Sequence, residues 1–297
     1  MKNWFEKLQA LSWAGKLHLS CPMAPYTTFK IGGPAAALLD IGSASDVQQA
    51  IGFAKENGVR AFVMGNGSNL LVRDEGFDGL ILRMGDAFAR ISVEQTRISA
   101  QSGALLGALS HAALAHGLTG LEFASGIPGS VGGAVYMNAG AYGGQMADCV
   151  VGAQVYLDGA VSFWDREKLD FSYRRSALKS GGIVLETVFE LEKGDPAAIA
   201  ETMRTLNAQR REKQPLTLPS AGSAFKRPQG AFAAELIDRC GLKGLRVGDA
   251  QVSEKHAGFI VNLGNARAAD VLQLADQVRA AVLEKTGYLL ETEFIVL

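Results

Sequence analysis

Apolar residues recur at a spacing of three or four positions in five stretches of the chain, which is typical of helices packed on one face. In the first stretch, Ser45 and Gln48 form a capping box and Gly58 ends the helix. In the third, Pro196 follows Asp195 in the first turn, where a missing N–H costs nothing. The predicted helices cover 45–57, Ala104–His116, 195–211, Ala231–Cys240 and Ala268–Lys285.

Alternating or short apolar runs predict strands between these helices. The clearest are Arg60–Met64, Ile183–Leu191 and a closing strand over Leu289–Val296. Strands and helices follow one another without a regular strand–helix–strand rhythm, and neither repeats nor low-complexity linkers occur. The expected fold class is therefore α+β.

Composition and charge narrow the function classes. A chain of 297 residues is long enough for two or three domains, and its net charge of −1 argues against a nucleic-acid partner. No apolar run is long enough to cross a membrane, and no signal peptide is apparent. Cys21, Cys149 and Cys240 are far apart and form no CxxC pair. We therefore expect a cytoplasmic protein without a metal site.

Glycine is in excess, with 35 residues, about 12% against an ordinary ~7%. One cluster, Gly65-Asn66-Gly67-Ser68-Asn69-Leu70, follows a predicted strand. Its backbone N–H groups can wrap a pyrophosphate, with Ser68 and Asn69 adding donors. A hairpin that merely needs glycine is the alternative.

A longer glycine-rich block extends over 120–144 and holds eight glycines. Its small residues predict an irregular backbone, neither a regular helix nor a long strand, that a flat or charged ligand approaches closely; a crowded domain junction is the alternative. No Gly-Lys-Ser/Thr follows either loop, and no acidic residue about 20 residues on sits at the end of a second predicted strand, so neither is a Walker A or a dinucleotide fingerprint. This leaves a nucleotide cofactor held in a non-Rossmann manner.

Seven ordered motifs, from about residue 20 to the C-terminus, carry a family resemblance. They are Thr28-Phe29-Lys30-Ile31-Gly32-Gly33-Pro34-Ala35, Gly65–Asn69, Gly126–Gly143, Ser172-Tyr173-Arg174-Arg175-Ser176, Pro219–Lys226, Ala234–Gly244 with His256–Asn262, and Leu290-Glu291-Thr292-Glu293. Together they resemble the enolpyruvoylglucosamine reductases, of the short type without an extra substrate loop. The resemblance implies the FAD-binding fold of the vanillyl-alcohol oxidase type in two lobes, plus a smaller C-terminal α+β substrate-binding domain.

The resemblance also implies a domain division and a cofactor. We expect an N-terminal helical extension over 1–20, FAD-binding lobes over 21–85 and 86–212, and a substrate-binding domain over 213–297 whose closing strand returns towards the active site. FAD is expected to be non-covalent, because no histidine lies in the glycine-rich loops, and NADPH is the expected co-substrate. The implied FAD-binding residues are Ile31, Gly32, Gly65, Asn66, Gly67, Ser68, Asn69, Leu70, Ile127, Pro128, Gly129, Ser130, Gly132, Gly133, Asn138, Gly140, Ala141 and Tyr142.

Three residues match the catalytic positions of the family. Arg174 would clamp the substrate carboxylate, Ser223 would donate a proton, and Glu293 would support charge or proton movement. Without the resemblance, the pattern alone indicates a surface arginine, a loop serine and a solvated carboxylate on a strand. Regular alternation puts Glu291 and Glu293 on one strand face, and the family match selects Glu293.

The implied substrate is UDP-N-acetylglucosamine enolpyruvate, reduced to UDP-N-acetylmuramate, and we expect a monomer. Lysine and arginine at a helix end otherwise indicate only complementarity to the helix dipole. The matching substrate-side residues are Arg210, Lys213, Gln214, Lys226, Lys243, His256 and Asn262. Another FAD oxidoreductase of the same fold, or a non-catalytic module binding FAD or a UDP-sugar, remains the alternative.

Overall fold

The computed structural model describes residues 3–297, and the chain forms two compact units. Unit 1 contains residues up to Leu19, Ala37–Asn66 and Gly79–Gln209; unit 2 contains Ser20–Ala36, Gly67–Asp78 and Arg210–Leu297. Met1 and Lys2, the first residues of the expected N-terminal extension, lie outside the described part. Within that part, no helix has both the length and the apolar character needed to cross a membrane.

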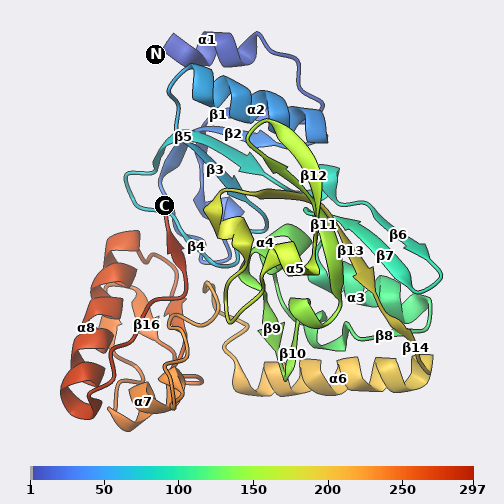
Figure 1. Ribbon diagram of the computed structural model, residues 1–297. Coiled ribbons are helices and arrows are strands. Elements are labelled where there is room, and N and C mark those ends of the chain that lie inside the picture. The colour runs from blue at the N-terminus through green and yellow to red at the C-terminus, as the bar shows by residue number, and fades with distance from the viewer. Residues whose placement is uncertain (1–2) are drawn as a thin grey trace. The chain divides into compact units, whose positions relative to one another are not determined.

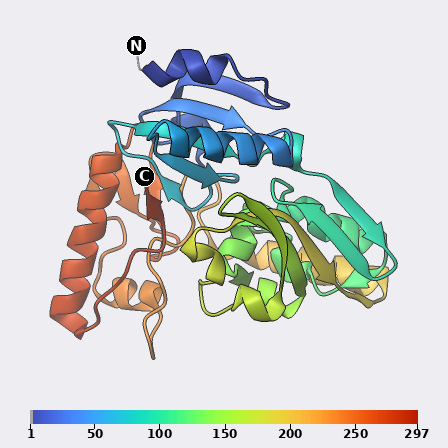
Figure 2. The ribbon, with the colours of Figure 1, turned by 45° about the horizontal axis from the view of Figure 1, so that its top comes forward.

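The N-terminal part of unit 1 is a sheet with the strand order β1-β2-β5-β3. Helix α2 packs along it (Figure 2): its apolar side chains Val47, Ala50 and Phe53 join a core with Leu39 and Leu80. β3 and β5 are parallel. The elements are α1 Asn3–Gln9, β1 Lys16–Pro22, β2 Pro34–Asp40, α2 Ala44–Glu56, β3 Ala61–Met64 and β5 Phe77–Arg83.

The predicted start of α2 is wrong by two residues. Ser43, and not Ser45, caps the helix, and its side chain accepts a hydrogen bond from the N–H of Asp46. The carboxylate of Asp46 in turn accepts from the N–H groups of Ala14, Gly15 and Gly42. The N-terminal segment is thereby tied to the start of α2, which no local pattern indicates.

The rest of unit 1 contains a second sheet of five antiparallel strands, in the order β12-β11-β13-β7-β6. Helices α3 and α4 share one apolar core with these strands. The strand predicted from Ile183 is confirmed as β13. The elements are β6 Ile91–Glu94, β7 Arg97–Gln101, α3 Leu106–Ala115, α4 Val131–Met137, β11 Val150–Leu157, β12 Ala160–Asp165, α5 Arg166–Leu169 and β13 Ile183–Glu190.

Helix α4 corrects the prediction that the glycine-rich block holds no regular helix. Tertiary hydrogen bonds fix its first turn: Val131 N–H donates to Ala104 O at 2.8 Å and Gly132 N–H to Ser102 O at 2.9 Å. A Cβ on Gly132 would lie 2.6 Å from the Ser102 Cβ, so only glycine permits this approach. The poor helix propensity of glycine is thus overridden by packing against residues 102–104.

Shorter elements complete unit 1, and the long helix α6 Pro196–Lys213 runs from unit 1 into unit 2. Its predicted start with proline in the first turn is confirmed. The short pairs are β9 Gly140–Ala141 with β10 Gly144–Gln145, and β8 Leu118–Thr119 with β14 Glu192–Lys193. The single turns of 3₁₀ helix in unit 1 are η2 Asp86–Phe88, η3 Glu122–Ala124, η4 Met146–Asp148 and η5 Ala177–Ser180, whereas η1 Ala24–Tyr26 lies in unit 2.

Unit 2 is built around helix α8, which packs on a three-stranded sheet in the order β15-β16-β17 (Figure 1). Val271, Leu274 and Val278 of α8 are fully buried in its core, as their helical spacing predicts. The elements are β4 Leu70–Leu71, α7 Ala233–Arg239, β15 Arg246–Val247, β16 Ala250–Val252, β17 Ile260–Asn262, α8 Ala268–Thr286 and β18 Ile295–Val296.

The predicted closing strand is wrong over most of its length. Only Ile295–Val296 is regular strand, and it pairs in parallel with β4. Residues before it contact a different segment through a single bridge between Phe225 and Thr292. The C-terminal segment therefore changes partner at Phe294, which alternation along the sequence does not reveal.

Candidate active site

In unit 1 the two glycine-rich segments lie against each other where β3 ends. A Cβ on Gly65 would lie 1.9 Å from the Ser130 Oγ, which is far inside contact distance. Beside it, Asn66 Nδ2 donates to the Pro128 carbonyl at 2.6 Å. The close contact of Gly65 with Ser130 and the hydrogen bond of Asn66 to Pro128 thus bring together four residues that are predicted to bind the cofactor.

Ser130 is the most informative residue of this group. It is buried, and its Oγ has no hydrogen-bond partner among the described residues. Its backbone is held by a bridge to Leu105, and the neighbouring Gly129 carbonyl accepts from Leu106 N–H at 3.0 Å. Buried hydroxyls are nearly always paired, so a fixed and unpaired hydroxyl among glycines is an observation that favours a bound ligand.

Asn138 ends α4 in the left-handed conformation, with φ of 44°. Its amide is used within unit 1: Nδ2 donates to Gln145 Oε1 and to Ser172 O, each at 3.0 Å, and Oδ1 accepts from Ala147 N–H at 2.9 Å. The side chain of Asn138 therefore shapes this loop. Tyr142, four residues on, is exposed at a hairpin with φ of 51°.

Arg174 lies in the turn that Asn138 holds. Its backbone is left-handed, with φ of 54°, and its Nη1 donates to Gly140 O at 3.5 Å. The guanidinium carbon lies 5.4 Å from the centroid of the Tyr173 ring, and Lys179 Nζ donates to the Arg174 carbonyl at 2.8 Å. A non-glycine residue in this backbone conformation is uncommon and points to a local constraint. Unit 1 thus places Arg174 beside the predicted cofactor residue Gly140.

Unit 2 contains the remainder of the first glycine loop. Gly67 has φ of 63°, and its carbonyl accepts from Thr28 N–H at 3.2 Å. The backbone N–H groups of Gly67, Ser68 and Asn69 donate to none of the residues that the structure describes. Such a run of unpaired N–H groups is the arrangement that binds anions such as phosphate.

Ile31 and Gly32 lie in the same unit and have different roles. Ile31 is buried, and its carbonyl accepts from Thr27 Oγ1 at 3.0 Å. A Cβ on Gly32, whose φ is 145°, would lie 2.8 Å from the Val72 Cβ. Gly32 is therefore required by close packing as well as by its backbone conformation.

Ser223 is held by two neighbouring segments of unit 2. It forms a bridge with Phe259, and the next residue, Ala224, donates its N–H to Gly258 O at 2.7 Å. Gly222, just before it, has φ of 76° with open space at its Cβ position, so the turn requires glycine for conformation alone. The backbone that carries the Ser223 side chain is therefore fixed on its C-terminal side by the bond of Ala224.

Glu293 lies on the C-terminal segment, which pairs with the opposite edge of residues 224–226. Its N–H donates to Ala224 O at 2.8 Å, and its carbonyl accepts from Asn69 Nδ2 at 3.1 Å. Unit 2 therefore brings the backbones of Ser223 and Glu293, two of the three predicted catalytic residues, onto adjacent segments.

Glu291 occupies a different environment from Glu293. Its carboxylate forms an ion pair with Lys226 at 2.8 Å, and this hydrogen bond holds the pKa of Glu291 below its usual value. The Glu291 side chain is 69% exposed. The Glu291 carboxylate is already paired with Lys226, a predicted substrate residue, so the environments of Glu291 and Glu293 differ.

His256, a predicted substrate residue, has a shifted pKa. Burial lowers its pKa from the ordinary value, and the charge of Lys243 lowers it further. Its Nδ1 accepts from Gly258 N–H at 3.2 Å, which leaves the proton of the neutral ring on Nε2. Lys243 Nζ itself bonds Asp238 at 2.7 Å. His256 is thus a neutral donor whose ring also braces the residue that pairs with Ala224.

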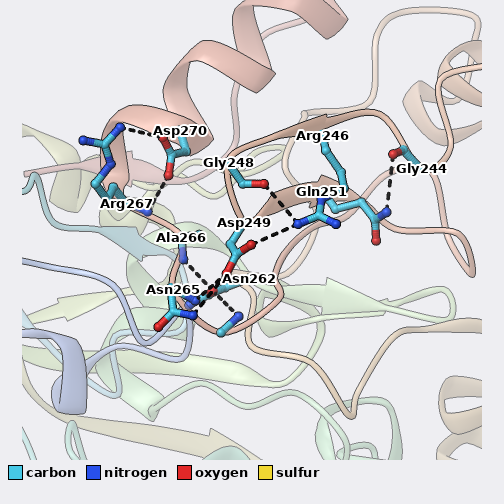
Figure 3. Close-up of polar contacts among 11 residues, drawn as sticks. Gly244, Arg246, Gly248, Asp249, Gln251, Asn262, Asn265, Ala266, Arg267 and Asp270 are labelled. Atoms are coloured by element: carbon cyan, nitrogen blue, oxygen red, sulfur yellow. Dashed lines mark hydrogen bonds and ion pairs between the residues drawn. The ribbon is translucent and has the colours of Figure 1, made fainter.

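Asn262 is buried in the core of unit 2, among the polar contacts drawn in Figure 3. Its Oδ1 accepts from the N–H groups of Gly264 and Ala266, at 2.8 and 3.0 Å, and its Nδ2 donates to Phe29 O at 3.1 Å. Both ends of the amide are used within the protein. The arrangement favours a structural role for this side chain in the loop after β17.

The remaining predicted residues lie at the end of α6. Gln214 donates its N–H to Arg210 O at 2.9 Å, and its own Oε1 is buried without a partner among the described residues. Lys213, between them, is exposed. A buried, unpaired amide oxygen again favours a polar ligand.

Two residues that support the site are missing from the prediction. Thr28 Oγ1 donates to Ser220 O at 2.6 Å, and the Gly258 carbonyl aligns Ala224. Both lie inside the motifs that carry the resemblance, but neither side chain suggests chemistry. Only these hydrogen bonds show how the two residues support the site.

Comparisons with known proteins identify the family and the domains of the chain. A model of the C-terminal domain of UDP-N-acetylenolpyruvoylglucosamine reductase matches residues 214–297, and an FAD binding domain model matches residues 35–161. The expected α+β class with an FAD-binding domain and a C-terminal domain is confirmed.

Whole-chain relatives extend the match. The chain is 48% identical to the UDP-N-acetylenolpyruvoylglucosamine reductase of Alkaliphilus oremlandii, over 92% of this chain and 90% of that protein. It is 46% identical to the enzyme of the same name from Clostridium novyi, over 97% and 94%. The crystal structure of the reductase from Thermus caldophilus superposes with a TM-score of 0.82 at 40% identity, covering 95% of this chain and 98% of that one. The chain therefore belongs to the UDP-N-acetylenolpyruvoylglucosamine reductase family.

Proposed function

We propose that this protein reduces UDP-N-acetylglucosamine enolpyruvate to UDP-N-acetylmuramate with NADPH, through non-covalently bound FAD, in the synthesis of peptidoglycan precursors. FAD would be held by residues before position 213 and the UDP-sugar mainly by residues 213–297. The match of the family's C-terminal domain model to residues 214–297 supports this division.

The residues present suit FAD. Within residues 3–297, Ser130 offers a buried hydroxyl without a partner, and Gly67, Ser68 and Asn69 offer three unpaired backbone N–H groups. Glycine at position 65 keeps the backbone open beside Ser130. These donors would hold the pyrophosphate and ribityl oxygens. When bound, FAD would accept hydride from NADPH and pass hydride to the methylene carbon of the enolpyruvyl group.

Arg174 would bind the substrate carboxylate. As the methylene carbon gains hydride, negative charge develops on the adjacent carbon and spreads into that carboxylate. Two parallel N–H bonds from a guanidinium strengthen as the charge grows, so they lower the barrier more than they tighten ground-state binding. The left-handed backbone and the contact with Gly140 limit the orientations of Arg174 before substrate arrives.

Ser223 would complete the reduction by donating its hydroxyl proton to the carbanionic carbon, and Glu293 would orient that end of the substrate or a proton-relaying water. A hydroxyl is a weak acid, so this step needs a strongly basic carbon and a fixed geometry. The hydrogen bond from Glu293 N–H to Ala224 O supplies that geometry, because it sets the spacing of the two residues.

The UDP portion needs polar and cationic partners for two phosphates. Lys213, Lys243 and Arg210 carry the charge, and Gln214 and the Nε2–H of His256 would add neutral donors or acceptors. Because His256 stays neutral near pH 7, its contribution is a directed hydrogen bond.

The observation that carries the proposal is the backbone pairing that brings Ser223 and Glu293 onto neighbouring segments, since a non-catalytic FAD or UDP-sugar module has no use for a proton donor. The test is anaerobic. The purified protein should be yellow, release all flavin on acid precipitation, lose its flavin absorbance with NADPH and regain it when the enolpyruvyl substrate is added, with the lactyl ether product identified by mass. A protein that takes up no FAD, or reduced flavin that the substrate fails to reoxidise, would contradict the proposal.

A further inference from the structure

The parallel pairing of β18 with β4 contains one irregular hydrogen bond at its start. Leu297 N–H donates to Leu71 O and Ile295 N–H donates to Asn69 O, each at 2.9 Å. In a parallel ladder, a residue that accepts from residue j+1 of its partner strand donates its own N–H to residue j−1. Asn69 accepts from residue 295, so the regular partner of its backbone N–H is the carbonyl of Glu293.

The side chain of Asn69 takes that place. Its Nδ2 donates to Glu293 O at 3.1 Å, whereas its backbone N–H donates to none of residues 3–297. The carbonyl of Glu293 is thus satisfied at the end of the ladder, as a half-buried carbonyl must be. The exchange leaves the peptide N–H of Asn69, like those of Gly67 and Ser68, without a hydrogen-bond acceptor among the described residues.

We propose that Asn69 is a positioning residue for Glu293, and that its side chain, by replacing a backbone bond of the ladder, keeps its own backbone N–H available for an anionic group of the cofactor. The first half of this inference rests on the proposed function of Glu293. With the bond from Glu293 N–H to Ala224 O, both peptide groups that flank the Glu293 Cα are anchored, which restricts the direction of its side chain.

The chemistry of the position selects asparagine. The side chain must reach the neighbouring strand and must donate, so aspartate has the right length but offers no donor when ionised. Asn66, three residues earlier, is the matched comparison, since its Nδ2 donates to Pro128 O and has no bond to the C-terminal segment.

A first experiment reads the hydrogen bonds without activity. Amide hydrogen exchange of residue 69 would be followed by NMR in protein with and without FAD. Its amide should exchange rapidly in the apo-protein and become protected when FAD binds, while the amides of Ile295 and Leu297, which are bonded in the ladder, stay protected in both. Protection of the position 69 amide without FAD would show that the backbone closes the ladder and would overturn the inference.

A second experiment reads the effect on Glu293. With Asn69→Asp at saturating FAD, reoxidation by the enolpyruvyl substrate should slow about 5- to 150-fold more than reduction by NADPH slows, in kcat rather than KM, because one half-buried carbonyl is left unpaired. Asn69→Asp and Glu293→Gln should be strongly non-additive, whereas Asn66→Ala and Glu293→Gln should be additive.

The outcomes separate the inference from the function on which it rests. Additive effects of Asn69→Asp and Glu293→Gln, or equal slowing of both half-reactions, would overturn the positioning role. A wild-type protein that binds FAD but does not reduce the enolpyruvyl substrate would contradict the proposed function. In that case the exchange experiment would still decide whether the side chain of Asn69 replaces the backbone bond.

Discussion

A methyl group at position 65 tests how the two glycine-rich segments of unit 1 meet. In Gly65→Ala the new Cβ would lie 1.9 Å from the Ser130 Oγ, well below the 3.0 Å that real Cβ contacts respect. Gly65 does not have a positive φ, so the cost is steric and not conformational. One inserted carbon in a packed region typically costs about 1–3 kcal/mol, and we expect the free energy of unfolding of the apo-protein to fall by that amount.

The second substitution identifies the atom responsible. In Gly65→Ala combined with Ser130→Ala, the nearest neighbour of the new Cβ becomes the Ser130 Cβ, at 3.1 Å. That overlap is relieved by a shift of a few tenths of an ångström, so most of the lost stability should return. Ser130→Ala alone should leave apo-protein stability unchanged or slightly raised, because its Oγ has no partner to lose. It should nevertheless weaken FAD binding if the hydroxyl holds the cofactor.

The assay is urea unfolding of the four apo-proteins, followed by circular dichroism, with FAD affinity measured separately by fluorescence. Gly52→Ala is the control, since Gly52 lies in α2 with nothing within 4 Å of its Cβ position. It should stabilise the protein by about 0.5–1 kcal/mol. Equal destabilisation in Gly65→Ala with and without Ser130→Ala would refute the reasoning, since Ser130 Oγ would then not occupy the space.

Three further predictions concern the site. Ser223→Ala should leave reduction of FAD by NADPH unchanged and slow reoxidation by the enolpyruvyl substrate by roughly 10²–10⁴ in stopped-flow, whereas equal slowing of both steps would make the serine structural. Glu293→Gln should lower kcat far more than it changes KM, while Glu291→Gln, which removes only an exposed ion pair, should change stability by less than about 1 kcal/mol and turnover little. The pKa of His256 is lowered by burial, so the folded protein binds this proton less readily than the unfolded chain. Its stability should therefore decrease as the pH falls below about 6.5, with a smaller decrease in His256→Gln, and parallel urea midpoints of the two proteins between pH 7 and pH 5 would contradict this.

Several elements were predictable because local pattern and tertiary burial agree. The apolar stripe of α8 is buried residue by residue, and Pro196 begins α6 as its fixed φ favours. Where the prediction failed, a distant segment decided the outcome. Asp46 ties α2 to residues 14, 15 and 42, and α4 forms in a glycine-rich segment because residues 102–104 bind its first turn.

The candidate site divides in the same way. Ordered motifs were enough to select Arg174, Ser223 and Glu293 and to predict FAD, since the residue types and their order survive in one dimension. Alternation could not separate Glu291 from Glu293, because it puts both on one face of a strand. In the structure the C-terminal segment is not one regular strand: it pairs with residues 224–226 and then with β4. The ion pair of Glu291 with Lys226 became visible only in three dimensions.

The sequence by itself determined the α+β class and the amphipathic helices, and it selected the residues predicted to carry the chemistry, because hydrophobic periodicity, glycine content and motif order are local properties. Only the tertiary structure decided which of those side chains are used in hydrogen bonds within the protein and which remain available to a ligand. Asn138 and Asn262 proved to be bonded at both ends of their amides, while the hydroxyl of Ser130 has no partner in the part of the chain that the structure describes. The physical reason is that a hydrogen bond joins groups whose separation along the chain, such as that of Asn69 and Glu293, is unrelated to their distance in space.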